Sequence, residues 1–130
     1  MTGAGDSGPA MDVEDLEVYR RAYQVSLAVH RASLGYPPIE QRVLADQLRR
    51  ASKSICANLA EGFGRRGHAP ADFRRFVAMG IGSADEMRVW LRYARDLGYV
   101  EPAQVAAWSA AYAEIARMLQ GLRRGPRPRP

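Results

Sequence analysis

Three glycines, Gly62, Gly64 and Gly67, lie at the G-x-G-x-x-G spacing that holds the pyrophosphate in dinucleotide-binding proteins. A true fingerprint of this kind follows a β-strand and opens a helix, because strand edge and helix N-terminus together form the phosphate site. Here the preceding residues, SICANLAE, continue an apolar repeat with helical spacing. We therefore interpret AEGFGRRG as a helix end and a turn, with Gly62 as a left-handed cap, and we predict no cofactor.

Few other residues have the chemistry of a catalytic or metal site. The chain contains one cysteine, Cys56, and two histidines, His30 and His68. This set can form neither a zinc cluster nor an internal disulfide, and no Glu-x-x-His pair is present. We expect no metal and no enzyme activity. Cys56 is interpreted as a small packing residue or a subunit-contact residue, and His30 as a structural histidine of the core.

Arginine is the residue type with the clearest functional potential. The chain has 19 Lys and Arg against 14 Asp and Glu, and residues 42–95 hold eleven bases against five acids. Such a surface predicts salt-sensitive contacts with the phosphates of RNA or DNA. The alternative is a solvated face whose arginines pair with Asp46, Asp72 and Asp85. The candidate nucleic-acid-binding residues are Arg42, Arg49, Arg50, Lys53, Arg65, Arg66, Arg74 and Arg75.

These residues would be positioned by four amphipathic helices, expected at about 15–34, 39–60, 69–98 and 101–121. Short connections favour antiparallel neighbours, so the predicted fold is all-α, an up-down-up-down four-helix bundle. We place the bundle at residues 14–122. Residues 1–13 and the Arg/Pro tail, 123–130, are expected to be disordered.

Two of these helices carry more apolar surface than one bundle core requires. In the first helix the core stripe is expected to run through Leu16, Tyr19, Tyr23, Leu27, His30 and Leu34. A second stripe on each of the first and third helices predicts self-association, although a single wide core stripe is the alternative. The candidate subunit-interface residues are Val18, Val25, Val29, Met79, Trp90 and Tyr93.

Polar residues flank the apolar stripes of the second and third helices. Half-buried polar groups need partners, because an unpaired one costs about 1–3 kcal/mol. We predict a structural hydrogen-bond network between these helices or between subunits, with a ligand or nucleic-acid contact as the alternative. Its members would be Ser54, Asn58, Glu61, Ser83 and Glu86.

The sequence also predicts the cellular compartment of the protein. Residues 1 to 12 show no basic start followed by an apolar run, and no stretch approaches the ~18 apolar residues of a membrane span. The single cysteine fits a reducing environment. We expect a cytoplasmic protein with no membrane association.

Three runs of the sequence resemble one bacterial family of four-helix bundles, the ribosomal S23 or 23S rRNA intervening-sequence proteins. The runs are DLEVYRRA (15–22), DQLRRASKSICANLAEGFGR (46–65) and FRRFVAMGIGSADEMRVWLRYARDLGYV (73–100). The resemblance covers residues 14 to about 122 and implies a homopentamer. The accessory variability determinants of diversity-generating retroelements are similar pentameric bundles that bind nucleic acid.

Together these observations predict a non-enzymatic oligomer that binds RNA or DNA through a basic surface. The alternative is a structural scaffold for a protein partner without nucleic acid. Salt dependence separates the two, because electrostatic binding to phosphates is strongest at low salt.

Overall fold

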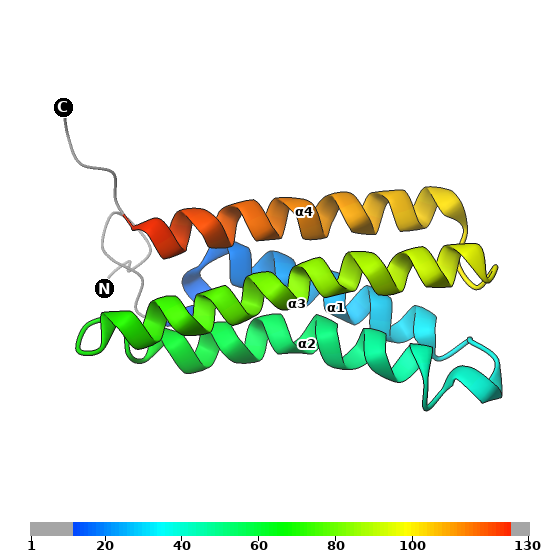
Figure 1. The fold of residues 1–130 in the computed structure, drawn as a ribbon, viewed down its shortest axis with the longest axis horizontal. Helices are drawn as coiled ribbons and strands as arrows, with labels where there is room; N and C mark the ends of the chain where they lie inside the picture. The colour runs from blue at the N-terminus through cyan, green and yellow to red at the C-terminus, as the bar shows by residue number, and fades with distance from the viewer. Residues whose placement is uncertain (1–11, 126–130) are drawn as a thin grey trace.

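The computed structural model consists of four long helices and two short 3-10 helices, and it describes residues 12–125 of the chain (Figure 1). It contains no β-strand within that range. The all-α, up-down-up-down bundle is confirmed. The elements are η1 (Val13–Asp15), α1 (Glu17–Ser33), η2 (Pro38–Glu40), α2 (Leu44–Phe63), α3 (Pro70–Asp96) and α4 (Pro102–Arg124).

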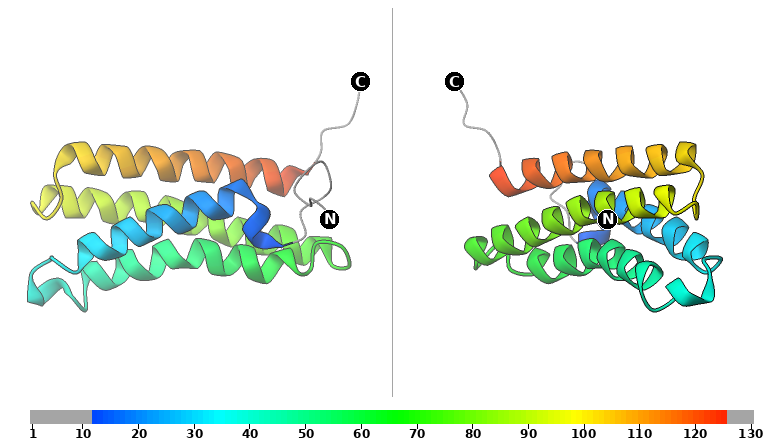
Figure 2. Two further views of the ribbon diagram at one scale, coloured as in Figure 1. Left: turned by 180° about the vertical axis from the view of Figure 1, so that it is seen from behind. Right: turned by 45° about the vertical axis from the view of Figure 1, so that its right-hand side comes forward.

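Consecutive helices are antiparallel, so the start of α1, the α2–α3 turn and the end of α4 lie at one end of the bundle (Figures 1 and 2). The α1–α2 and α3–α4 connections lie at the other end. Helix α3 packs extensively on both α2 and α4, whereas α1 and α4 make fewer contacts. The bundle is therefore most open between α1 and α4.

The core lies along the bundle axis and is built mainly of aliphatic side chains. Burial of such side chains supplies the main driving force for folding. None of the helices within residues 12–125 has the length and apolar content needed to cross a membrane. The largest fully buried side chains are Tyr112, Leu48, Ile55, Leu59, Met87, Leu91, Ile115, Leu119, Val29 and Val77.

The expected orientation of α1 is wrong. Its buried side chains include Val18, Val25 and Val29, exposed by 5%, 9% and 1%, so these valines are core residues rather than an outer interface stripe. Tyr23 and Leu34 of the expected core stripe are 47% and 62% exposed. Small β-branched side chains let α1 approach the other helices closely, while the tyrosine stripe keeps its hydroxyl groups near water.

Gly62 does not cap α2 in a left-handed conformation. It is a buried residue within the helix, which ends at Phe63. A Cβ atom at Gly62 would lie 2.8 Å from the Cβ of Phe76, so the glycine is required by the close approach of α2 and α3. A left-handed glycine does follow α3, where Gly98 has φ 81°.

Three helix or segment boundaries also differ from expectation. Helix α2 begins at Leu44 rather than near residue 39, because Pro38 starts a separate 3-10 turn. Arg123 and Arg124, assigned to the tail, are the last residues of α4. Asp12, assigned to the N-terminal segment, caps η1 through a capping box with Asp15. The remaining residues of both predicted disordered segments, apart from Val13 and Gly125, lie outside the described range.

Candidate nucleic-acid interface

The eight predicted basic residues do not form one patch. They fall into two groups separated by α2, whose 20 residues correspond to a length of about 30 Å. Arg42, Arg49 and Arg50 lie near its start, with Lys53 in its middle, and the other four surround the α2–α3 turn. A single short stretch of phosphates therefore cannot contact all eight residues.

Arg49 has a structural role in the first group. Its guanidinium donates to the Ser33 hydroxyl at 2.8 Å and to the Gln41 carbonyl and side-chain oxygens at 2.7 and 3.2 Å. Gln41 in turn donates to the backbone carbonyls of Ser33 and Tyr36. These bonds connect the end of α1 to the start of α2, so Arg49 is committed to the fold. Sequence periodicity places Arg49 on the polar face but gives no sign of this network.

The other residues of the first group are more exposed. Arg50 forms an ion pair with Asp46 at 2.8 Å, one of the pairings weighed as the alternative to nucleic-acid binding. Lys53 contacts the Nδ1 atom of His30 at 2.8 Å. Arg42 is exposed in the turn before α2. Within the described residues these three side chains have no partner in common that would direct them toward one ligand.

The second group lies around the α2–α3 turn, and three of its four arginines contact an aromatic ring. We call this group the arginine end: Arg65, Arg66, Arg74 and Arg75. The guanidinium carbons of Arg65 and Arg75 lie 5.0 and 4.9 Å from the centre of the Phe76 ring. That of Arg66 lies 3.6 Å from the centre of the Phe63 ring. Such cation–π contacts fix a long side chain without covering its N–H groups.

Two carboxylates partly neutralise the arginine end. Arg65 pairs with Glu61 at 2.7 Å, and Arg75 pairs with Asp72 at 3.5 Å. Arg74 is exposed and has no ion-pair or hydrogen-bond partner within the described range. The end of α4 lies at the same end of the bundle and adds Arg123 and Arg124 (Figure 1). The acidic residues of η1 lie there as well, beside α1 and α2.

Part of the predicted polar network connects α2 to α3. The Ser54 and Ser83 hydroxyl oxygens are 2.9 Å apart, and Asn58 donates to the Ser54 hydroxyl and carbonyl oxygens. Glu61 and Glu86 do not join them. Glu61 pairs with Arg65, and Glu86 accepts a hydrogen bond from the indole of Trp90.

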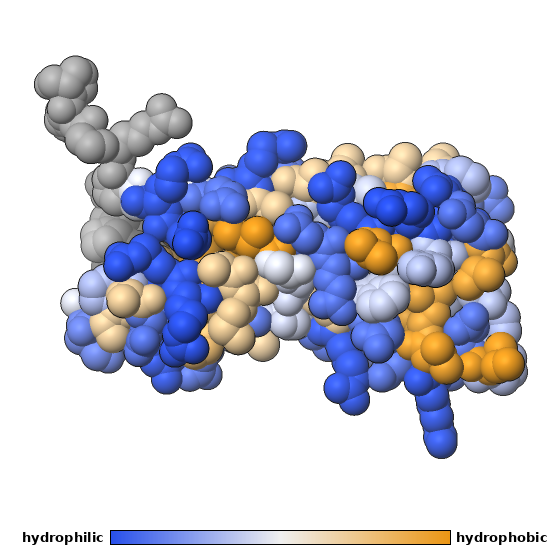
Figure 3. Space-filling model, viewed as in Figure 1, coloured by the Kyte–Doolittle hydropathy of each residue, from blue (hydrophilic) through white to orange (hydrophobic). Residues whose placement is uncertain are grey.

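Exposed apolar side chains gather at the end opposite the arginines, which we call the apolar end. In the face shown in Figure 3 the most hydrophobic residues concentrate toward that end. The α1–α2 and α3–α4 connections meet there through the rings of Tyr36 and Tyr99, whose centres are 5.2 Å apart. The apolar end consists of Leu34, Ile39, Val43, Val89, Tyr93 and Leu97, each between 41% and 79% exposed.

The three predicted interface residues of α3 lie on its outer side. Tyr93 belongs to the apolar end, with its ring centre 6.1 Å from that of Trp90, which is half-buried. Met79 is 47% exposed and lies nearer the middle of the helix. These side chains remain accessible to a partner, unlike the three valines of α1.

Two groups weighed for catalysis, Cys56 and His30, line one groove between α1 and α2, but within residues 12–125 they are not paired with each other. Burial raises the pKa of the Cys56 thiol to about 11, so the thiol is protonated at neutral pH. Its sulfur lies 3.9 Å from the Tyr19 carbonyl oxygen. His30 contacts Lys53 rather than Cys56, and it is half-exposed instead of lying in the core. Residues 12–125 contain no cluster of three or more His, Cys, Asp or Glu that could bind a metal.

The relation to known proteins is shown by a family match. The profile of the family described as 23S rRNA-intervening sequence protein matches residues 14–121. The chain belongs to this family. A crystal structure of a protein with unknown function from the S23 ribosomal protein family of Bacteroides thetaiotaomicron VPI-5482 is similar to this intervening-sequence protein, with a TM-score of 0.69. The two are 20% identical, over 83% of this chain and 99% of the other, which supports the shared fold alone. No curated protein matches the sequence.

Proposed function

We propose that this intervening-sequence protein is a non-enzymatic bundle that binds RNA or DNA phosphates through its arginine end. The observation that carries the proposal is the pair of guanidiniums of Arg65 and Arg75, held near the ring of Phe76 about 5 Å from its centre. Ordered side chains lose less entropy on binding than free ones. Arg74 lies beside them in the first turns of α3.

The guanidinium groups of the arginine end are suited to phosphate oxygens. Arginine presents several N–H donors and binds phosphate in a bidentate manner. Glu61 pairs with Arg65, and Asp72 pairs with Arg75. Exposed ion pairs of this kind contribute only about 0–1 kcal/mol to stability. A phosphate can therefore share or displace these carboxylates at little cost. Contacts to phosphates carry no sequence information, so we expect such binding to be sequence-independent.

The test is a titration with single-stranded RNA, single-stranded DNA and duplex DNA at two or more salt concentrations. The double variant R74Q/R75Q should weaken binding and reduce the slope of log K against log salt by about 1 to 2. The matched control is R88Q/R92Q, which removes the same charge from exposed positions farther along α3. Absence of binding at about 50 mM salt, or equal effects of the two variants, would overturn the proposal.

We further propose that the protein associates with itself through the outer side of α3 and the apolar end. Six exposed large apolar side chains at one end form a surface that association would cover. The family resemblance suggests a ring of five. If no nucleic acid binds, the same surface supports the second candidate function, a scaffold for a protein partner. The single cysteine agrees with action in the cytoplasm.

A further inference from the structure

A second surface feature lies between α1 and α2, away from the arginine end. It is a groove with a volume of about 370 Å³, which falls within the range of about 300–1,000 Å³ typical of small-molecule sites. Its walls are mostly apolar or aromatic, and none of its lining residues is acidic. The lining residues are Tyr19, Tyr23, Ser26, Leu27, His30, Lys53 and Cys56.

Two tyrosines form one wall of the groove. The rings of Tyr19 and Tyr23 are stacked, with centres 6.3 Å apart and planes inclined by 14°. Tyr23 is 47% exposed, an unusual fraction for an aromatic ring on a helix that already buries a separate stripe of valines. A stacked pair of this kind offers a flat apolar surface to a second aromatic group.

Two basic groups lie in the same groove without a carboxylate. The Lys53 ammonium lies 2.8 Å from Nδ1 of His30 and donates a hydrogen bond to that nitrogen of the neutral imidazole. Partial burial lowers the pKa of both groups, and Arg49 adds to the effect on each. For His30 the charges of Lys53 and Arg31 lower the pKa further. The site thus carries positive charge that an anion would stabilise.

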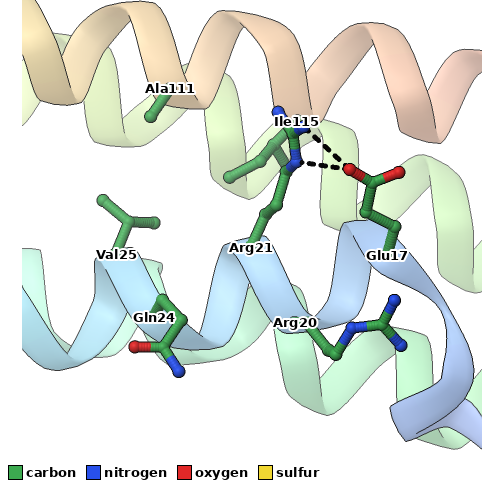
Figure 4. Close-up of a pocket in the computed structure, with 7 residues that line it drawn as sticks. All are labelled: Glu17, Arg20, Arg21, Gln24, Val25, Ala111 and Ile115. Atoms are coloured by element: carbon green, nitrogen blue, oxygen red, sulfur yellow. Dashed lines mark hydrogen bonds and ion pairs between the residues drawn. The ribbon is translucent and has the colours of Figure 1, made fainter.

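The groove between α1 and α4 differs in this respect. It is larger, with a volume of about 620 Å³, but an acidic residue, Glu17, lines it and pairs with Arg21, one of its two arginines. Figure 4 shows Glu17 paired with Arg21 close to Ile115, with Val25 and Ala111 on the two facing helices. The Nη2 atom of Arg21 and the Oε2 atom of Glu17 are 2.8 Å apart. The α1–α2 groove therefore has no lining carboxylate to compete with a bound anion, whereas the α1–α4 groove has one.

We propose that the α1–α2 groove binds a small organic anion with a flat apolar body, such as an aromatic carboxylate. The ring packs on Tyr19 and Tyr23, and the carboxylate accepts a hydrogen bond from the Lys53 ammonium. This binding is independent of the proposed nucleic-acid binding, because it uses another face of the protein and none of the residues of the arginine end.

The test uses 2-naphthoate as the probe. Its binding to the full chain is measured by calorimetry and by changes in amide chemical shifts. We expect a Kd of about 1 mM or lower, a modest affinity in keeping with the few contacts of a ligand this small. Naphthalene-2-carboxamide, which keeps the ring and loses the charge, should bind at least tenfold more weakly, because a hydrogen bond to a charged group is lost. Acetate, which keeps only the charge, should show no measurable binding. Shifts should concentrate at Tyr19, Tyr23, Lys53 and Cys56.

Two variants locate the site. Lys53→Met should weaken naphthoate binding at least tenfold, whereas Arg50→Met, one turn away and paired with Asp46, should leave it unchanged. Tyr23→Ala should weaken it as well, and both changed side chains are exposed enough to leave folding intact. R74Q/R75Q should have no effect, which separates this site from the arginine end. Equal affinity for acid and amide, unchanged affinity in Lys53→Met, or shifts confined to the apolar end would overturn the proposal.

Discussion

Arg49 and Arg50 are neighbours on α2 with the same charge, yet their surroundings differ. Arg49 is half-buried and donates three hydrogen bonds to Ser33 and Gln41 across the α1–α2 connection. Arg50 is largely exposed and makes one ion pair with Asp46 on its own helix. Both residues were equal candidates for binding phosphates, but only Arg50 can turn toward a ligand without loss of structure.

This contrast predicts unequal effects on stability. Arg49→Met should lower the free energy of unfolding by about 2–3 kcal/mol, since it leaves the acceptor oxygens of Ser33 and Gln41 without this donor. Arg50→Met should lower it by no more than about 0.5 kcal/mol, as expected for an exposed pair within one helix. Urea denaturation measures both. Arg49→Lys should restore little of the stability lost in Arg49→Met, because one ammonium group cannot reproduce the contacts of the planar guanidinium. Similar effects at the two positions would contradict the structural role of Arg49.

A buried tyrosine offers a second test at this scale. Tyr112 is fully buried, and its hydroxyl has no hydrogen-bond partner within the described range. Burial also raises its pKa, so the phenol remains neutral. Tyr112→Phe should leave stability unchanged or raise it by up to about 1–2 kcal/mol, because the variant removes a desolvated polar group.

The control for Tyr112 is Tyr99→Phe. The hydroxyl of Tyr99 donates to Glu40 at 2.8 Å, so its loss should cost about 1 kcal/mol. Thermal or urea unfolding compares the two variants directly. If Tyr112→Phe is as destabilising as Tyr99→Phe, a buried water molecule bonded to Tyr112 is the simplest explanation, and the hydroxyl then has a structural role.

At the scale of elements, the sequence is sufficient to predict the four helices and their order along the chain. It is not sufficient to predict which face of α1 is buried. Helices α2 and α4 each have one dominant stripe, such as Leu48, Ile55 and Leu59 of α2, and those three residues are buried as expected. Helix α1 has two apolar stripes, so periodicity alone cannot choose between them. The choice depends on side-chain shape, because the valines pack more closely than Tyr23 against the neighbouring helices. At the arginine end, the contact of Arg65 in the α2–α3 turn with Phe76 of α3 joins residues eleven positions apart and carries no local signal in the sequence.

Gly62 shows how the contact between α2 and α3 depends on one missing side chain. Gly62→Ala should destabilise the protein by about 1–3 kcal/mol, because the new Cβ would lie 2.8 Å from that of Phe76 and push the helices apart. The higher helix propensity of alanine, about 1 kcal/mol, offsets only part of this cost.

The matched control is Gly82→Ala, also within a helix. A Cβ atom at Gly82 would meet nothing within 4 Å, so this variant should be more stable by up to about 1 kcal/mol. Opposite signs at the two glycines, measured by thermal unfolding, would support close helix approach as the reason for Gly62. A stabilising Gly62→Ala would show that α2 and α3 can separate at no cost.

At the scale of the whole molecule, the bundle has two unlike ends. The α2–α3 turn presents ordered arginines, and the opposite end presents exposed aliphatic and aromatic side chains. Copies that associate through α3 and the apolar end would carry several arginine ends in one assembly. Linked phosphate sites bind a polyanion more tightly than one site, provided that the geometry allows simultaneous contacts. Self-association and nucleic-acid binding would then reinforce each other.

Self-association can be tested without disturbing the core. Light scattering coupled to size-exclusion chromatography should give a mass well above the 14.4 kDa of one chain, and a ring of five would have about 72 kDa (5 × 14.4 kDa). Tyr93→Asp changes a side chain that is 56% exposed, so the monomer should fold normally, yet a carboxylate buried in an interface should dissociate the assembly. Ala71→Asp adds the same charge at an exposed position in the first turn of α3, at the arginine end, and should leave the mass unchanged. If Tyr93→Asp keeps the wild-type mass, the outer side of α3 is not the interface, and a monomeric wild type at every concentration would contradict self-association altogether.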